Sequence, residues 1–511
     1  MSKNNTDFKQ TLWKAADSLR GQMDSSEYKH IVLGLIFIKY ISDSFEEHTK
    51  KIKEMVTNPD SEFFISEDLS DISHQVFEDR DYFTKDNIFW VPQSARWDNL
   101  RDQAKQTNIG EIIDSALVDI ESENSALKGK LDKRFGKTEL PASKLGKLID
   151  EISTIGLSEN LEAGDILGEV YEYFLGQFAS AEGKKGGEFY TPSCVVRTLV
   201  SILKPTSGRV YDPCCGSGGM FVHSEDFIRS HGGRVDDISI YGQESNPTTW
   251  RLASMNMAIR GFGADLGKSN NDTFANDNFP DIKFDFILSN PPFNFSDWDG
   301  ERYVNDKRWQ FGTPPAGNAN YAWLQHIFSK LKNKGHAAVI LGNGALIAKD
   351  REGKIRESMV NEDIVSAIIS LPGQLFFNTP TPVSIWILSK SKKFNIDRTN
   401  QILFIDAKKL GRMESKKLRV LDEEHIQKIS TKYGEWQNSS YYKDEKGFCK
   451  SVSLELVKEK EFKLTPIRYI DFFGKKSSQQ INSDINLIVK TIENQTKKNQ
   501  ELRNHIENNG L

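Results

Sequence analysis

The chain has 511 residues, a net charge of −5, a hydrophobic content of 38% and 27% charged residues. This length is too great for one ordinary domain and predicts two or three. The acidic balance argues against a protein that grips nucleic acid through overall basicity, so a nucleic-acid substrate would require a local basic patch or a partner.

The cysteines and the apolar segments further limit the class of protein that we expect. Cys194, Cys214, Cys215 and Cys449 form no C-x-x-C pair and have no histidine at metal-ligand spacing, so we expect a reduced protein with no metal site. The longest apolar stretch, residues 31–41, contains a lysine and is shorter than the roughly 20 residues that span a bilayer. No charged leader with a cleavage site precedes it, and we therefore expect a cytoplasmic protein without a membrane partner.

The first part of the chain has the periodicity of helices. Apolar residues recur at helical spacing from Phe8 to Lys53, and again over residues 109–120. The following segment, 128–144, is rich in Lys and Gly and predicts a loop. We therefore expect a helical N-terminal domain over residues 1–145.

After about residue 160 strands alternate with helices, which predicts an α/β domain with a doubly wound, Rossmann-like parallel sheet. Helices are expected at 162–180, 192–203, 219–231, 246–260 and 319–333. Strands are expected at 208–212, 238–243, 284–289, 336–341, 364–370, 382–389 and 401–406. This seven-stranded domain is expected to cover residues 160–475.

The tail, residues 476–511, has a pattern of its own. Ile481, Ile485, Ile488 and Ile492 alternate spacings of four and three, the repeat of a coiled-coil seam, and the register continues through two polar positions. Polar seam residues weaken a long coiled coil of identical chains but suit a helix that packs on a specific partner. The alternative is a helix folded back on its own domain.

The strand expected at 284–289 stops at Asn290, Pro291, Pro292 and Phe293. Proline fixes its own φ and cannot continue a ladder, so a buried strand ends here in a rigid loop. Ligands of open α/β sheets bind beyond the carboxyl ends of the strands. An amide, a carbonyl held by prolines and an aromatic ring at this point are therefore placed to face a substrate. A strand-capping turn with Phe293 as a buried plug is the alternative.

A glycine-rich turn follows the strand expected at 208–212. It consists of Asp212, Pro213, Cys214, Cys215, Gly216, Ser217, Gly218 and Gly219. Its glycines let the backbone pass close to a ligand, but it is neither a G-x-G-x-x-G fingerprint nor a phosphate loop. The Asp212 carboxylate suits a cationic group such as the amino group of an amino acid. A tight structural turn is the alternative.

Two further carboxylates are candidates for contacts to a nucleoside. Glu244 lies about 30 positions after the glycine-rich turn, at the tip of the second strand, where an acid accepts both hydroxyls of a ribose. Asp272 lies in a loop rich in Gly, Asn and Ser, where it can accept from an adenine amino group. A solvated strand end or helix cap for Glu244, and a turn residue for Asp272, are the alternatives.

A last stretch precedes the helix expected at 192–203. It contains Glu188, Phe189, Tyr190, Thr191 and Pro192. Thr191 suits the N-cap and Pro192 the first helical position, so a plain helix start is one interpretation. The other is that the aromatic pair closes over a cofactor.

The four stretches, 187–192, 212–219, Glu244 and 290–293, in this order, closely resemble those of adenine-N6 DNA methyltransferases, specifically the modification subunit of type I restriction-modification systems. The resemblance covers nearly the whole chain. It implies S-adenosylmethionine as cofactor, bound by residues 188–192, the glycine-rich turn apart from Cys215, Glu244, Asp272 and Asn290.

The resemblance also implies roles at the target base. The Asn290 side-chain oxygen and the Pro291 carbonyl accept the two N–H groups of adenine N6, and Phe293 stacks on a base flipped out of the duplex. It further implies partners. A separate specificity subunit reads DNA, two modification subunits assemble with it, and a restriction subunit joins the full complex. Where similar sequences have a glycine-containing loop, this chain has prolines at 379–382, so we assign no role to Phe376 and Phe377.

Two other functions compete with this interpretation. A protein-glutamine or RNA amino-group methyltransferase shares the Asn-Pro-Pro chemistry, although we do not expect it to carry this N-terminal domain together with the stretch at 187–192. A non-enzymatic scaffold with the same fold has no reason to keep Asp212, Glu244, Asn290 and Phe293 together.

Overall fold

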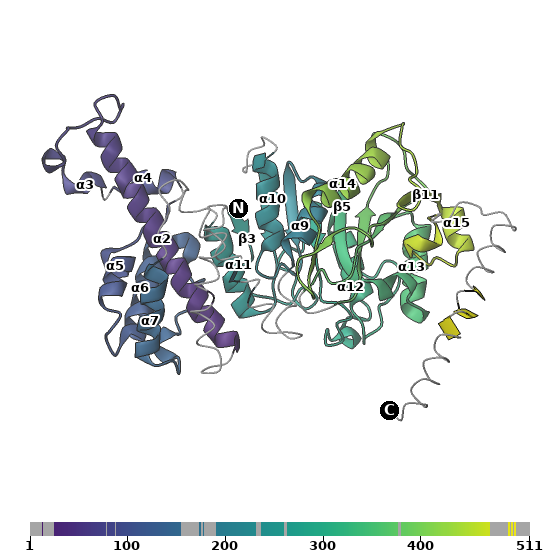
Figure 1. The fold of residues 1–511 in the computed structure, drawn as a ribbon, viewed down its shortest axis with the longest axis horizontal. Helices are drawn as coiled ribbons and strands as arrows, with labels where there is room; N and C mark the ends of the chain where they lie inside the picture. The colour runs from purple at the N-terminus through teal and green to yellow at the C-terminus, as the bar shows by residue number, and fades with distance from the viewer. Residues whose placement is uncertain are drawn as a thin grey trace.

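The computed structural model describes residues 13, 25–77, 79–86, 88–154, 173–174, 177, 191–230, 237–259, 263–376, 380–470, 489–490, 492–493 and 495–496. Figure 1 shows the N-terminal helices gathered at one end of the molecule and a large central sheet flanked by helices at the other. The chain is therefore a mixed α/β protein.

The helices at the N-terminal end share one apolar core. They are α2 (Ser25–Thr57), α3 (His74–Phe77), α4 (Arg80–Lys85), α5 (Trp97–Asp102), α6 (Ile109–Glu123) and α7 (Ala142–Ser153). The apolar stripe expected over 109–120 lies on α6 and is buried. The loop expected at 128–144 is too long, because α7 begins at Ala142. Gly146 of α7 passes so close to the chain at Ala104 that a Cβ there would lie 2.2 Å from the Ala104 carbonyl oxygen.

In the described part of the chain the sheet has nine strands in the order β11-β8-β6-β7-β5-β4-β1-β2-β3. They are β1 (Gly208–Asp212), β2 (Ile238–Gly242), β3 (Ala264–Asp265), β4 (Phe284–Ser289), β5 (Leu331–Gly342), β6 (Val365–Ser370), β7 (Val383–Ser389), β8 (Gln401–Asp406) and β11 (Cys449–Ser453). β7 and β11 run antiparallel to their neighbours and the remaining pairs are parallel. A separate hairpin pairs β9 (Arg412–Met413) with β10 (Arg419–Val420).

The prediction of a seven-stranded parallel sheet is therefore wrong in its count and its directions, although all seven expected strands are present. β3 has two residues, too few for an apolar pattern. β11 reads Cys-Lys-Ser-Val-Ser, and this polar sequence suits an edge strand but resembles a loop. β5 starts at Leu331, so the helix expected at 319–333 ends at Lys330.

Helices cover both faces of the sheet. α9 (Ser193–Leu203), α10 (Gly219–Ser230) and α14 (Glu423–Asn438) pack on one face. α12 (Asn320–Lys330), α13 (Asp350–Asn361) and α15 (Leu454–Glu459) pack on the other. α11 (Pro247–Ile259) joins the two ends of the molecule, because Trp250 and Met257 belong to the sheet core whereas Leu252 and Met255 belong to the N-terminal core.

The strand order reverses between β1 and β4, and this reversal positions the site. β1 pairs in parallel with β2 and with β4, matching Asp212 with Gly242 and Tyr211 with Ile287. The three carboxyl ends therefore meet at one edge. Such a switch point is where open α/β sheets bind ligands.

Two expected helices cannot be followed here. The helix expected at 162–180 and the tail 476–511 lie outside the described residues, apart from short pieces. Among the described helices none is long and apolar enough to cross a membrane.

Candidate functional site

The turn after β1 brings the backbone close to α11. Gly216 has a φ of 55° and Gly218 a φ of 83°. A Cβ on Gly218 would lie 2.7 Å from Met257 Cε. The turn is tied to the end of β2, because Cys215 N donates to the Gln243 carbonyl at 2.9 Å and Gln243 N to the Asp212 carbonyl at 3.0 Å. The positive φ therefore favours glycine at both positions, and at Gly218 a side chain would also have to displace the end of Met257.

Asp212, at the tip of β1, is only 2% exposed. Its Oδ1 accepts from Cys214 N at 3.1 Å and from Ser289 Oγ at 2.9 Å, whereas no described residue donates to Oδ2. Burial raises the pKa of Asp212 to about 7, although these hydrogen bonds favour the charged form. A positively charged ligand group beside Asp212 would therefore favour its ionised form.

Glu244 follows β2 and is 5% exposed. Its Oε2 accepts from Gly216 N at 3.1 Å and its Oε1 from Asn246 N at 2.8 Å. Burial raises the pKa of Glu244. Among the described residues no basic side chain forms an ion pair with either Glu244 or Asp212. The two buried carboxylates therefore fit a ligand that brings positive charge and hydroxyl groups.

Asp272 lies beside Glu244, because Asn271 N donates to the Glu244 carbonyl at 2.9 Å. Its side chain is exposed in a turn, where Oδ1 accepts from Phe274 N at 2.7 Å and from Ala275 N at 3.0 Å. The turn interpretation of Asp272 is thus correct for Oδ1. Its Oδ2 accepts no hydrogen bond from a described residue.

The loop after β4 places an unsatisfied acceptor at the same edge. Asn290 Nδ2 donates to Thr191 Oγ1 at 2.9 Å, and this orients the amide. Asn290 Oδ1 is buried, and no residue that the structure describes donates a hydrogen bond to it. No described residue donates to the Pro291 carbonyl. A buried acceptor without a partner is costly, so Oδ1 is suited to receive an N–H group from a ligand.

Phe293 closes this loop and is half-buried. Its ring meets Phe376 edge to face, with centroids 5.9 Å apart and an interplanar angle of 81°. Phe376 is buried, and it therefore supports the Phe293 ring from the side. Phe377 lies outside the described residues.

The structure places most of the predicted site residues at one edge of the sheet. Those described there are Thr191, Asp212, Pro213, Cys214, Gly216, Ser217, Gly218, Glu244, Asp272, Asn290, Pro291, Pro292 and Phe293. Gly219 begins α10, and Pro192 precedes α9, which starts one residue later than expected. Glu188, Phe189 and Tyr190 lie outside the described residues.

Sequence reasoning missed Ser289 and the hydroxyl of Thr191. Ser289 donates to Asp212, and Thr191 accepts from Asn290. Each pair is far apart in the sequence, so no local pattern predicts the contact. Within the described part of the chain, no group of three or more His, Cys, Asp or Glu side chains is placed to hold a metal ion.

Comparisons with known proteins identify the family to which the chain is similar. The family model "N-6 DNA Methylase" matches residues 162–478, and the "HsdM N-terminal domain" model matches residues 8–152. A type I restriction enzyme HindI methylase subunit from Haemophilus influenzae is 44% identical over 400 residues, covering 74% of this chain and 89% of that protein.

Two other relatives extend the match along the chain. The type I restriction enzyme MjaIX methylase subunit from Methanocaldococcus jannaschii is 36% identical over 473 residues, covering 91% of this chain and 84% of that protein. The crystal structure of a type I restriction-modification methyltransferase subunit from Streptococcus thermophilus matches with a TM-score of 0.75 at 27% identity, covering 91% of this chain and all of that one. The chain therefore belongs to the N-6 DNA methylase family as a type I restriction-modification methylase subunit, an adenine-specific, S-adenosylmethionine-dependent DNA methyltransferase.

Proposed function

We propose that this chain methylates N6 of an adenine flipped out of DNA, with Asn290 and Pro291 holding the amino group. The observation that carries the proposal is the buried Asn290 Oδ1 at the carboxyl end of β4, to which none of the described residues donates. The Pro291 carbonyl, the next acceptor along the chain, also receives no hydrogen bond from a described residue. The two adjacent acceptors match the two N–H groups of an exocyclic amine.

These acceptors address the chemical difficulty of the reaction. The lone pair of adenine N6 is delocalised into the ring, so the nitrogen is a poor nucleophile. Accepting both N–H groups favours a pyramidal nitrogen and stabilises its developing positive charge. One preorganised group of this kind contributes roughly 3 kcal/mol, by analogy with the donors of oxyanion holes. The new N–C bond forms as the C–S bond of the cofactor breaks, and the product nitrogen loses its proton to solvent.

The carboxylates provide the cofactor side. When bound, S-adenosylmethionine supplies an electrophilic methyl group on a positively charged sulfur. We assign Asp212 to its amino group, Glu244 to its ribose hydroxyls and Asp272 to its adenine amino group. The backbone of residues 213–219 passes beside it, and residues 188–192 are proposed to cover it.

A base inside a duplex cannot reach this loop, so the target adenine must leave the stack at a cost of a few kcal/mol. Phe293 is proposed to stack on the flipped base and recover about 1 to 3 kcal/mol. The edge-to-face contact with Phe376 fixes the Phe293 ring for this role.

Target choice is assigned to a separate specificity subunit, which binds two copies of this chain and, in the full complex, a restriction subunit. We propose that the tail 476–511 docks on the specificity subunit and that the N-terminal domain, 1–145, contacts DNA or the second copy. Deleting residues 477–511 should abolish co-purification with the specificity subunit while S-adenosylmethionine binding persists. Intact assembly of the truncated chain contradicts the docking role.

The decisive experiment follows tritium from labelled S-adenosylmethionine into DNA, RNA and protein, with and without the specificity subunit. We expect transfer to DNA adenine that requires the specificity subunit. Asn290→Ala should reduce transfer about 100-fold, because one preorganised acceptor is lost, and should leave cofactor affinity unchanged. The matched control is Asn438→Ala at the exposed end of α14. Transfer to glutamine or RNA, or full activity of Asn290→Ala, contradicts the proposal.

A further inference from the structure

One arginine, Arg308, connects the cofactor side of the site to the target side. It lies in the segment between the Asn290 loop and α12, and its side chain is only 15% exposed. Its Nη1 donates to the Thr273 carbonyl at 3.0 Å and its Nη2 to the Phe274 carbonyl at 2.8 Å. Asp306 accepts from its Nε and Nη2 at 2.9 and 2.6 Å. The planar fork thus holds two backbone carbonyls in one fixed geometry.

Those two carbonyls belong to the turn that presents Asp272. Asp272 Oδ1 accepts from the N–H groups on one side of this turn, at Phe274 and Ala275, while Arg308 holds the carbonyls on the other side. Thr273 Oγ1 donates to the Pro213 carbonyl in the turn after β1. The Asp272 turn is therefore attached both to the glycine-rich turn and to Arg308.

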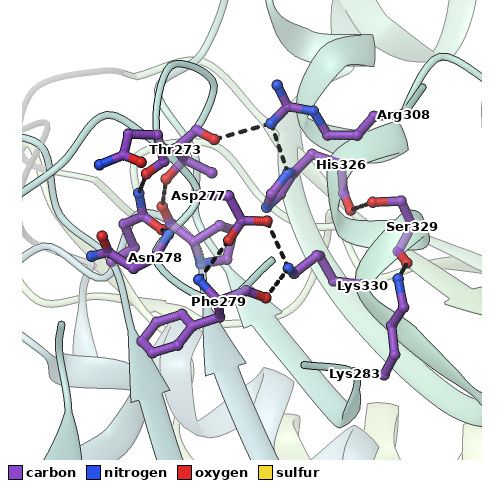
Figure 2. Close-up of polar contacts among 12 residues, drawn as sticks. Thr273, Asp277, Asn278, Phe279, Lys283, Arg308, His326, Ser329 and Lys330 are labelled. Atoms are coloured by element: carbon purple, nitrogen blue, oxygen red, sulfur yellow. Dashed lines mark hydrogen bonds and ion pairs between the residues drawn. The ribbon is translucent and has the colours of Figure 1, made fainter. Parts of the chain in front are cut away.

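Arg308 and a lysine attach this loop to α12 (Figure 2). Arg308 Nη1 lies 3.2 Å from Nδ1 of the fully buried His326, and Lys330 Nζ donates to Asp277 at 2.6 Å and to the Phe279 carbonyl. Burial and the Arg308 charge hold the pKa of His326 well below its usual range. His326 is therefore neutral and accepts from Arg308 through Nδ1.

The other end of α12 holds the target loop. Asn294 N donates to Asn320 Oδ1 at 3.0 Å, and Asn320 Nδ2 donates back to Asn294 Oδ1 at 2.9 Å. Ala319 N donates to the Phe295 carbonyl at 2.9 Å. Helix α12 is thus a common frame, with the chain just after Phe293 at its start and the Asp272 loop near its end.

We infer that Arg308 is a positioning residue for the cofactor: by holding the Thr273 and Phe274 carbonyls against α12, it sets the place of Asp272 relative to Asn290. The inference rests on the proposed contact between Asp272 and the cofactor's adenine. Arg308 acts through Asp272 and touches neither substrate. A purely structural arginine would instead stabilise the nearby aromatic cluster of Phe274 and Trp309 without a selective effect on cofactor affinity.

The test compares Arg308→Met with Arg302→Met in the full-length chain. Arg302 lies in the same segment, and its exposed side chain pairs only with Asp299 among the described residues. Calorimetry with S-adenosylmethionine should show an affinity loss of about tenfold for Arg308→Met, the size expected for losing charge-assisted hydrogen bonds, and none for Arg302→Met. In the complex with the specificity subunit, KM for the cofactor should rise about tenfold while kcat at saturation stays within about threefold.

A double-variant cycle separates this inference from the proposed function. If Arg308 acts through Asp272, Arg308→Met combined with Asp272→Ala binds no more weakly than the weaker single variant. Two outcomes overturn the role of Arg308 and leave the proposed function intact. The first is that the losses of cofactor affinity in the two single variants add in the double variant, and the second is that Arg308→Met binds like the wild type while Asp272→Ala binds weakly. If Asp272→Ala binds the cofactor with wild-type affinity, the proposed contact between Asp272 and the cofactor's adenine is overturned. The action of Arg308 through Asp272 is then overturned as well.

Arg308→Lys keeps the test valid if Arg308→Met unfolds. Lysine keeps the charge but cannot hold two carbonyls and a carboxylate in one plane, so we expect weakened cofactor binding in a variant that still folds. Wild-type cofactor affinity of Arg308→Lys overturns the inference.

Discussion

The two walls of the site are built in opposite ways. On the cofactor wall the carboxylates of Asp212 and Glu244 are buried, and each already accepts hydrogen bonds from the chain's own groups. On the target wall Asn290 Oδ1 is buried, and it has no partner among the residues that the structure describes. One wall holds carboxyl groups that the chain's own donors orient, and the other holds neutral acceptors to which no described residue donates.

The difference fits the two proposed ligands. A sulfonium and an ammonium group favour ionised carboxylates, and burial strengthens that attraction. An uncharged exocyclic amine offers N–H groups, for which neutral acceptors suffice. The buried polar groups of each wall therefore cost free energy in the empty site, and the proposed ligand of that wall offsets the cost when it binds. Such an arrangement preorganises a site for its ligand. The following experiments disturb one wall at a time.

Asp212→Asn should have the largest effect. Removing the negative charge should weaken S-adenosylmethionine binding about 100-fold, because a charge-assisted contact in a buried site is lost. The same change should stabilise the protein without cofactor. The folded protein keeps the Asp212 proton up to about pH 7, whereas the ordinary value is 3.8, so the free energy of unfolding falls as pH rises through this window.

The destabilisation caused by ionising the buried Asp212 is fully present at pH 8. Removing it in Asp212→Asn should stabilise the fold by roughly 2 to 4 kcal/mol. Calorimetry with the cofactor and thermal unfolding at pH 8 measure the two effects. Asp226→Asn, on the exposed side of α10, is the control and should change neither. A destabilised Asp212→Asn protein contradicts the description of Asp212 as a strained carboxylate.

Phe293→Ala tests the target wall. Loss of stacking on the flipped base should raise KM for a DNA duplex about 30-fold, equivalent to about 2 kcal/mol, and leave cofactor affinity unchanged. Phe293→Tyr, which keeps the ring, should stay close to the wild type. A mismatch opposite the target adenine lowers the cost of flipping and should recover part of the loss. An equal loss on matched and mismatched duplexes contradicts the stacking role.

The dependence of cofactor affinity on pH should be smaller. Because cation binding requires the ionised form of Asp212, affinity should fall about tenfold between pH 8 and pH 6, as the carboxyl takes up its proton near pH 7. Glu244, whose pKa burial also raises, should steepen the fall at the acidic end. In Asp212→Asn the profile should be flatter. An unchanged profile in that variant assigns the titration to another group.

The sequence predicted residues whose role is set by where their strand ends, and it missed those that act across the fold. Asn290 and Asp212 follow apolar runs that stop at a proline, so their place at the sheet edge could be inferred from local pattern. The Thr191–Asn290 contact spans 99 positions and the Ser289–Asp212 contact 77, and neither leaves a local signal. Arg308 was not singled out by any sequence pattern, and only the fold brings it to the Thr273 carbonyl. The two-residue β3 was missed for a similar reason, because its pairing with β2 and not its own sequence makes it a strand.

Thr191→Val should have the smallest effect and tests how the target wall is oriented. Thr191 Oγ1 accepts from Asn290 Nδ2, which leaves Asn290 Oδ1 directed at the open position. Valine keeps the shape but removes this acceptor, so the amide loses its preferred orientation and also leaves Nδ2 unsatisfied. A neutral hydrogen bond contributes about 1 kcal/mol, and kcat should therefore fall about fivefold. Cofactor affinity should stay constant, because valine keeps the shape with which residue 191 is proposed to help cover the cofactor.

Thr191→Ser keeps the hydroxyl and should retain the wild-type rate, which separates the hydrogen bond from the methyl packing. A residual effect on cofactor affinity in Thr191→Val, but not in Thr191→Ser, would instead place this hydroxyl on the cofactor wall. Loss of kcat alone means that the open acceptor of Asn290 depends on a threonine almost one hundred positions earlier, so the target wall is oriented by the segment that begins α9 and not by the Asn-Pro-Pro loop alone.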